Sequence, residues 1–108
     1  MVETKLIILD KSYIPENEYQ KLDECFGSTY TTQIYSIVAA IYESGIILYV
    51  RGECNLDDIT KRDFPNLYKI MEYCRDNGYK YIDMFNSGEV LDSKTENKYH
   101  LKRFEHDT

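Results

Sequence analysis

The chain of 108 residues lacks tryptophan, and it lacks the motifs by which many catalytic sites are recognised. It contains no glycine-rich phosphate loop and neither an HExxH nor a GxSxG motif. No apolar run approaches the roughly 20 residues that a membrane-spanning helix needs. The first residues also lack the basic region, apolar stretch and cleavage site of a signal peptide. We therefore expect no catalytic residue, no cofactor and no membrane partner.

Positive charge is also scarce. Lysine and arginine total 13 against 19 aspartates and glutamates, which gives a formal net charge of −6. Proteins that bind duplex DNA or RNA normally carry a basic excess, because they neutralise phosphates. The balance argues against direct binding of nucleic acid.

The three cysteines, Cys25, Cys54 and Cys74, form no CxxC pair. An odd number without that spacing favours free thiols in a reducing, cytoplasmic compartment. Cys74 lies on the apolar stripe of a predicted helix, so we interpret it as a core residue. His100 and His106 are not placed to activate it, and they have no cysteine partners for a zinc site.

What the sequence has in abundance is tyrosine, with 11 residues. Tyrosine suits contact surfaces, because a large ring is presented with few rotatable bonds to immobilise. Each buried hydroxyl needs a hydrogen-bond partner, so a core of this size cannot accommodate all of them. We expect at least three or four tyrosines to face the surface.

Hydrophobic periodicity predicts the first half of the fold. Residues 6–9 form an unbroken apolar run, typical of a strand buried on both faces. A helix begins at Pro15. Residues 34–42 fit either a helix or a strand, and their β-branched content favours the strand. We interpret them and residues 46–50 as a hairpin joined by a three-residue turn that ends at Gly45.

The second half begins with a helix that starts near Pro65 and stops at Gly78. Its apolar stripe consists of Phe64, Leu67, Ile70, Met71 and Cys74. Residues 79–85 alternate as a strand, and residues 89–92 are predicted to form a short strand. Residues 93–108 are predicted to be a C-terminal tail or an edge strand.

These elements follow in the order β-α-β-β-α-β-β within a single domain, residues 1–92. The predicted class is α+β: a two-layer sandwich with two helices on one face of a mainly antiparallel sheet. The uncovered face would display one residue set from each strand, and we predict that it binds a protein partner. The candidates on this face are Tyr35, Tyr49, Tyr81, Asp83 and Phe85.

Acidic residues form two further candidate groups. Glu53, Asp57 and Asp58 lack the spacing and central glycine of an EF-hand, so we expect no metal and assign them to the partner-binding set. With Asp63 they form one cluster, and the first helix carries another. That second cluster consists of Glu16, Glu18, Asp23 and Glu24. Carboxylates spaced along a surface imitate phosphates and attract basic grooves.

The order of several segments resembles a small uncharacterised domain family of bacterial plasmids and integrative elements. The segments that carry the resemblance are DKSYIP at residues 10–15, YESGIILYV at 42–50, YCRDNG at 73–78 and GEVLD at 88–92. The resemblance spans residues 6–92, and the chain departs from the pattern at 85–87, where more acid is expected before the glycine. Genes of that family lie among antirestriction functions, which implies a setting in which small acidic proteins block defence nucleases.

From these observations we expect a small binding protein, encoded by a phage or mobile element, that inhibits a bacterial defence nuclease of the restriction or CRISPR type. Two alternatives stay open. One is a small enzyme or ligand-binding module with a pocket between sheet and helices. The other is a structural or regulatory homodimer.

Overall fold

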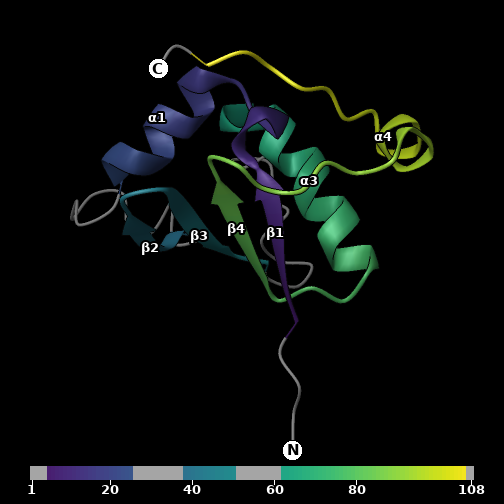
Figure 1. The fold of residues 1–108 in the computed structure, drawn as a ribbon, viewed down its shortest axis with the longest axis horizontal. Coiled ribbons are helices and arrows are strands. Elements are labelled where there is room, and N and C mark those ends of the chain that lie inside the picture. The colour runs from purple at the N-terminus through teal and green to yellow at the C-terminus, as the bar shows by residue number, and fades with distance from the viewer. Residues whose placement is uncertain (1–4, 26–37, 51–61, 107–108) are drawn as a thin grey trace, which may run out of the picture.

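The computed structural model describes residues 5–25, 38–50 and 62–106 (Figure 1). Within these residues the strands are β1 (Leu6–Asp10), β2 (Val38–Tyr42), β3 (Gly45–Tyr49) and β4 (Tyr81–Phe85). The α-helices are α1 (Glu16–Cys25), α3 (Pro65–Asp76) and α4 (Ser93–Tyr99), and a single 3₁₀ turn, η1 (Lys11–Tyr13), follows β1. The predicted α+β class is confirmed.

The four strands form one sheet in the order β1-β4-β3-β2. Strand β3 pairs antiparallel with both β2 and β4, as predicted, but β1 pairs parallel with β4. The sheet is therefore mixed. A parallel pair requires a connection that returns the chain to the same end of the sheet, and the long stretch between β1 and β4 provides it.

The hydrophobic core lies on one face of this sheet. Strand β4 turns Ile82 and Met84 inward, β3 turns Ile46 and Leu48 inward, and all four side chains are almost completely buried. The prediction that residues 6–9 are buried on both faces is wrong. Ile7 and Leu9 are buried, whereas Leu6 and Ile8 are 45% and 44% exposed, because β1 has a helix-covered core on one side only.

The hairpin of β2 and β3 is confirmed in its described part, with a tighter turn than predicted. Tyr42 pairs with Gly45, so the loop contains two residues, Glu43 and Ser44. Gly45 is the first residue of β3 and is buried. A Cβ atom there would lie 2.6 Å from the Met84 carbonyl oxygen and 2.9 Å from the Tyr42 hydroxyl. Glycine is required by this close approach.

Helix α3 covers the core face as predicted, with Leu67, Ile70, Met71 and Cys74 buried. Helix α1 instead lies near the end of the sheet where β1 and β4 finish, and it contacts β2 (Figure 1). The predicted layer of two helices on one face is thus matched in part. No helix within the described ranges has the length and apolar character needed to cross a membrane.

A buried carboxylate joins α1 to α3. Glu18 is 2% exposed. Its Oε1 accepts hydrogen bonds from the backbone N–H groups of Leu67 at 3.1 Å and Asn66 at 3.2 Å, and its Oε2 accepts from the Asn66 side chain at 2.6 Å. Phe64, the N-cap residue of α3, makes no side-chain cap. Glu18 therefore satisfies backbone donors at the positive end of the helix dipole.

The C-terminal part departs most from the prediction. Residues 89–92 form no strand: Glu89 makes a single parallel bridge to Leu9. Residues 93–99, predicted to be tail or edge strand, form α4, because the Asp92 side chain accepts a 2.7 Å hydrogen bond from the Thr95 N–H and caps the helix. The chain then returns along η1, where Phe104 donates its N–H to the Ser12 carbonyl.

The hydroxyl of Tyr13 holds this C-terminal part against the core. Tyr13 is 1% exposed. Its Oη donates to Oε2 of Glu96 in α4 at 2.7 Å and accepts from the backbone N–H of Leu91 at 2.7 Å. Burial and the neighbouring Glu96 carboxylate raise the pKa of Tyr13 to about 12.

The segment before α4 lies directly against β1. Gly88 has no room for a side chain, since a Cβ atom would lie 2.3 Å from the carbonyl carbon of Leu9. The neighbouring Glu89 accepts a hydrogen bond from the Asp10 N–H at 3.0 Å and donates its own N–H to the Ile8 carbonyl at 3.2 Å. Glu89 thereby forms an isolated one-residue bridge to β1, separate from the pairing of β1 with β4.

We expect Glu18→Gln to lower the free energy of unfolding by about 2 kcal/mol, because a charge-assisted cap is lost and an amide N–H₂ is turned toward buried donors. Chemical denaturation in urea measures this change. Asp23→Asn, at an exposed position of the same helix, removes the same charge and should change stability by less than about 0.5 kcal/mol. Equal effects of the two substitutions would contradict the capping role.

A second prediction concerns alkaline pH. The pKa of Tyr13 is higher in the folded protein than in the unfolded chain, so its stabilising contribution is present below about pH 10 and is lost as pH rises toward about pH 12. Tyr13→Phe should be less stable than the wild type at pH 7, and its stability should fall less steeply over that interval. Urea denaturation at a series of pH values tests this, and parallel curves for the two proteins would contradict it.

Candidate functional site

The face of the sheet opposite the core, called the outer face here, carries the strand residues that alternate with the buried ones. Pairing registers place the following residues on it: Leu6, Ile8, Asp10, Ala40, Tyr42, Gly45, Ile47, Tyr49, Tyr81, Asp83 and Phe85. Tyr42 and Tyr49 are 38% and 36% exposed, in addition to the exposed Leu6 and Ile8. The outer face is therefore a surface rich in aromatic and aliphatic side chains.

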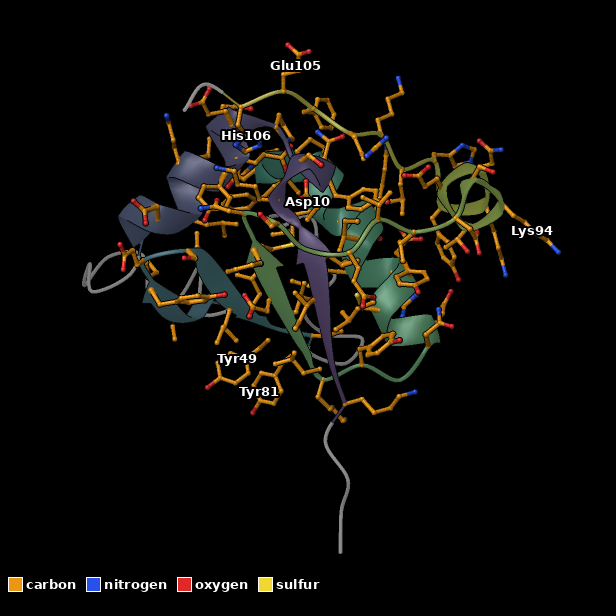
Figure 2. The ribbon with its side chains drawn as sticks, viewed as in Figure 1. Asp10, Tyr49, Tyr81, Lys94, Glu105 and His106 are labelled. Atoms are coloured by element: carbon orange, nitrogen blue, oxygen red, sulfur yellow. The ribbon has the colours of Figure 1, made fainter. Side chains whose placement is uncertain are left out.

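Its aromatic rings form two cross-strand pairs. Tyr42 stacks on Phe85 with ring centroids 6.4 Å apart and an interplanar angle of 13°. At the other end of the strands Tyr49 packs on Tyr81, with ring centroids 5.3 Å apart. Figure 2 shows these two side chains together at the lower end of the sheet. Such pairs hold the rings in fixed orientations.

Asp83 lies between the two pairs. It is half-buried in β4, and its register neighbours are Ile8 on β1 and Ile47 on β3. Tyr42 donates its hydroxyl to Oδ1 of Asp83 at 2.5 Å. Loss of water around the hydroxyl and this hydrogen bond to a carboxylate raise the pKa of Tyr42 to about 12. The result is a carboxylate oriented by a neutral tyrosine within an apolar surface.

The described strand positions of the outer face carry charges of one sign. Among the strand residues placed on it, the acidic ones are Asp10 and Asp83, and none is a lysine or an arginine. The Asp10 carboxylate accepts a hydrogen bond from the Ser12 N–H at 3.1 Å. Glu43 is exposed in the turn between β2 and β3 and lies outside the strand positions of this face. This face is complementary to a surface that carries cations among apolar groups.

Four of the residues predicted to bind a partner are brought together here: Tyr49, Tyr81, Asp83 and Phe85. The other four, Tyr35, Glu53, Asp57 and Asp58, lie outside the described residues. Sequence reasoning missed Tyr42, Ile8 and Ile47. For Tyr42 the signal was present, because a two-residue hairpin turn places it opposite Gly45 on the same face as Phe85.

The acidic cluster predicted on the first helix is not a continuous surface. Glu18 points into the core and is hydrogen-bonded to α3. Of the other members whose side chains are described, Glu16 is partly exposed and Asp23 is exposed. In the other cluster, Asp63 is half-buried and forms an ion pair with Arg62 at 3.0 Å. The carboxylate of Glu18 is therefore not available on the surface of α1 to imitate a phosphate.

Cys74 is completely buried, as predicted, and burial raises the pKa of its thiol to about 12. A thiol in this state is neither a nucleophile nor a metal ligand.

His106 Nε2 lies 2.8 Å from the Ile14 carbonyl oxygen, and its ring meets that of Tyr19 edge-on. In the described ranges no three His, Cys, Asp or Glu side chains are grouped so as to hold a metal ion.

Comparisons of the chain with family models, with curated proteins and with solved structures found no match in any of the three. The resemblance to the mobile-element family therefore stays a prediction, and the function is argued from the outer face.

Because its thiol is buried and neutral, Cys74 should react with a thiol reagent only when the protein unfolds. The test uses a variant in which Cys25 and Cys54 are replaced by serine, so that one thiol is followed. We expect no labelling by Ellman's reagent at pH 8 in buffer and complete labelling in concentrated urea. Rapid labelling in buffer, with the circular dichroism spectrum unchanged, would contradict this placement.

Proposed function

We propose that this protein is a small binding protein that docks the outer face of its sheet on a basic, arginine-bearing surface of another protein. The observation that carries the proposal is Asp83: an acidic group held by Tyr42 at the centre of an exposed aromatic and aliphatic surface.

The energetic argument concerns what such a group gains from a partner. A guanidinium group can bind a carboxylate with two hydrogen bonds while its plane stacks on neighbouring rings, here those of Tyr42 and Phe85. The surrounding apolar side chains exclude water once a partner covers them, which is the arrangement found at interface hot spots. Because the rings are already packed in pairs, docking immobilises few side chains.

The concrete form that we propose for the partner is a bacterial defence nuclease, of the restriction or CRISPR type. Two features support it: nucleases expose arginine and lysine where they hold phosphates, and the net charge of −6 would steer the protein toward such a surface. A nuclease surface covered in this way cannot hold DNA, so inhibition would follow from occupancy alone.

At the level of the outer face, we expect N-acetyl-arginine methylamide to shift the amide resonances of β3 and β4 in a saturable way, more strongly than the lysine analogue. Asp83→Asn should weaken this binding several-fold. Glu43→Gln, which removes the same charge from the exposed turn beside the face, should leave it within about twofold. Equal losses in the two variants would show general electrostatic attraction and would contradict a specific site.

At the level of the nuclease, expression of the wild-type protein should restore phage plating on a strain that carries a sensitive restriction or CRISPR system. Asp83→Asn should lose most of that protection, because removal of a hot-spot group costs about 2 kcal/mol of binding, or roughly 30-fold in affinity. Glu43→Gln should protect like the wild type.

Absence of protection across a panel of such systems would count against a nuclease as the partner. The arginine titration would still decide separately whether the outer face is a docking site. Light scattering separates the homodimer alternative: self-association that Asp83→Asn weakens and Glu43→Gln does not would assign the outer face to a second copy of this chain.

A further inference from the structure

A groove on the far side of the sheet from the outer face lies between α3 and the end of α4. Its volume is about 520 Å³, within the range of small-molecule sites. From α3 it is lined by Pro65, Tyr68, Lys69 and Glu72, which follow one another at helical spacing on one side of the helix, and from α4 by Lys98, Tyr99 and His100. Two tyrosines and a proline make one part of it apolar and flat-walled.

A second hollow of about 470 Å³ adjoins the first and is lined mainly by polar groups. Its lining residues are Lys69, Glu96, Asn97, His100, Leu101 and Lys102. Lys69 and His100 line both hollows, so they stand at the boundary between an aromatic compartment and a cationic one. A ligand that spans the two must have a flat apolar end and an anionic end.

Tyr99 is fixed in its place before any ligand arrives. Its hydroxyl donates to Oδ2 of Asp76 at 2.9 Å, and its ring meets that of Tyr73 edge-on at 5.4 Å. The ammonium group of Lys98 lies 5.5 Å from the centre of the Tyr99 ring. This side of the groove therefore presents an ordered ring with a cation beside it.

The position of His100 also follows from the fold. It is the one non-glycine residue with a positive φ, 59°, among the described residues, and it ends α4 by donating its N–H to the Asn97 carbonyl. The next residue, Leu101, is buried and donates to the Glu96 carbonyl at 2.8 Å. This turn brings His100 and Lys102 to the boundary and to the polar hollow.

The charges of the two hollows favour an anion in a protein that is acidic as a whole. Among the described lining residues, Lys69, Lys98 and Lys102 contribute three positive charges, against two carboxylates. One of these carboxylates, that of Glu96, accepts the hydrogen bond of the buried Tyr13 hydroxyl. Glu72 is the acid that remains at the aromatic compartment.

We infer that this pair of hollows binds a nucleotide, with the base against Tyr68 and Tyr99 and the phosphate held by Lys69, His100 and Lys102. A flat ring and a phosphate joined by a sugar are the two ends that the compartments require, and base stacking on tyrosine combined with lysine contacts is a general mode of nucleotide recognition. The site takes a single nucleotide and is separate from the docking function of the outer face.

The test is an NMR titration of the ¹⁵N-labelled protein with AMP, adenosine and inorganic phosphate at low salt. We expect AMP to shift the amides of residues 65–72 and 98–102 in a saturable way, at least about tenfold more tightly than either adenosine or phosphate. The double variant Lys69→Gln with Lys102→Gln should weaken AMP about tenfold or more and leave adenosine within about twofold. Tyr68→Leu should weaken AMP and adenosine and leave phosphate unchanged.

The matched control is Lys80→Gln with Lys94→Gln, which removes the same charge from exposed lysines outside the two hollows. It should bind AMP like the wild type. The proposal is overturned if AMP causes no saturable shifts up to about 10 mM, if phosphate binds as tightly as AMP, or if the control loses as much affinity as the groove variant. Asp83→Asn should bind AMP normally, so failure of this site and failure of the outer face are seen in different experiments.

Discussion

Strand β4 is paired on both sides, and this constraint organises the molecule. Because it lies between β1 and β3, each of its side chains must point either into the core or onto the outer face. Ile82 and Met84 fill the core, while the alternate positions place Asp83 between two aromatic pairs. A register change of one residue would bury the carboxylate and expose the core residues. The same alternation therefore determines both the stability of the sheet and the chemistry of its surface.

Local patterns were sufficient for the elements whose burial is periodic. The stripe from Phe64 to Cys74 located α3, and the alternation in residues 81–85 located β4 with the correct faces. For the candidate site, that alternation placed Tyr81, Asp83 and Phe85 together, and the hairpin added Tyr49. These predictions succeeded because each depends on contacts that repeat along a single segment.

The remaining features depend on contacts between segments far apart in the sequence. Nothing near Glu18 indicates that its carboxylate caps a helix 48 residues away, and a glutamate at helical spacing resembles any solvated acid. Likewise, α4 has no buried residue of its own. It is held by the Asp92 cap, by the contacts of Tyr99 with α3 and by the hydroxyl of Tyr13, which is 83 residues from Glu96. The composition of residues 93–99 alone therefore resembled that of a tail. The groove between α3 and α4 could not be predicted from the sequence either, because it depends on the packing of two helices that are far apart along the chain.

The bare backbone of Gly88 has a consequence for the behaviour of the protein in concentrated solution. A strand at the margin of a sheet offers unpaired amides and carbonyls to any neighbouring chain, and β1 would do so with Leu6 and Ile8 exposed beside them. The close passage at Gly88 lets Glu89 occupy the Ile8 carbonyl and the Asp10 amide. Two hydrogen-bonding groups of this margin are thereby paired within the molecule itself, so a neighbouring chain meets a shorter run of open amides and carbonyls along β1.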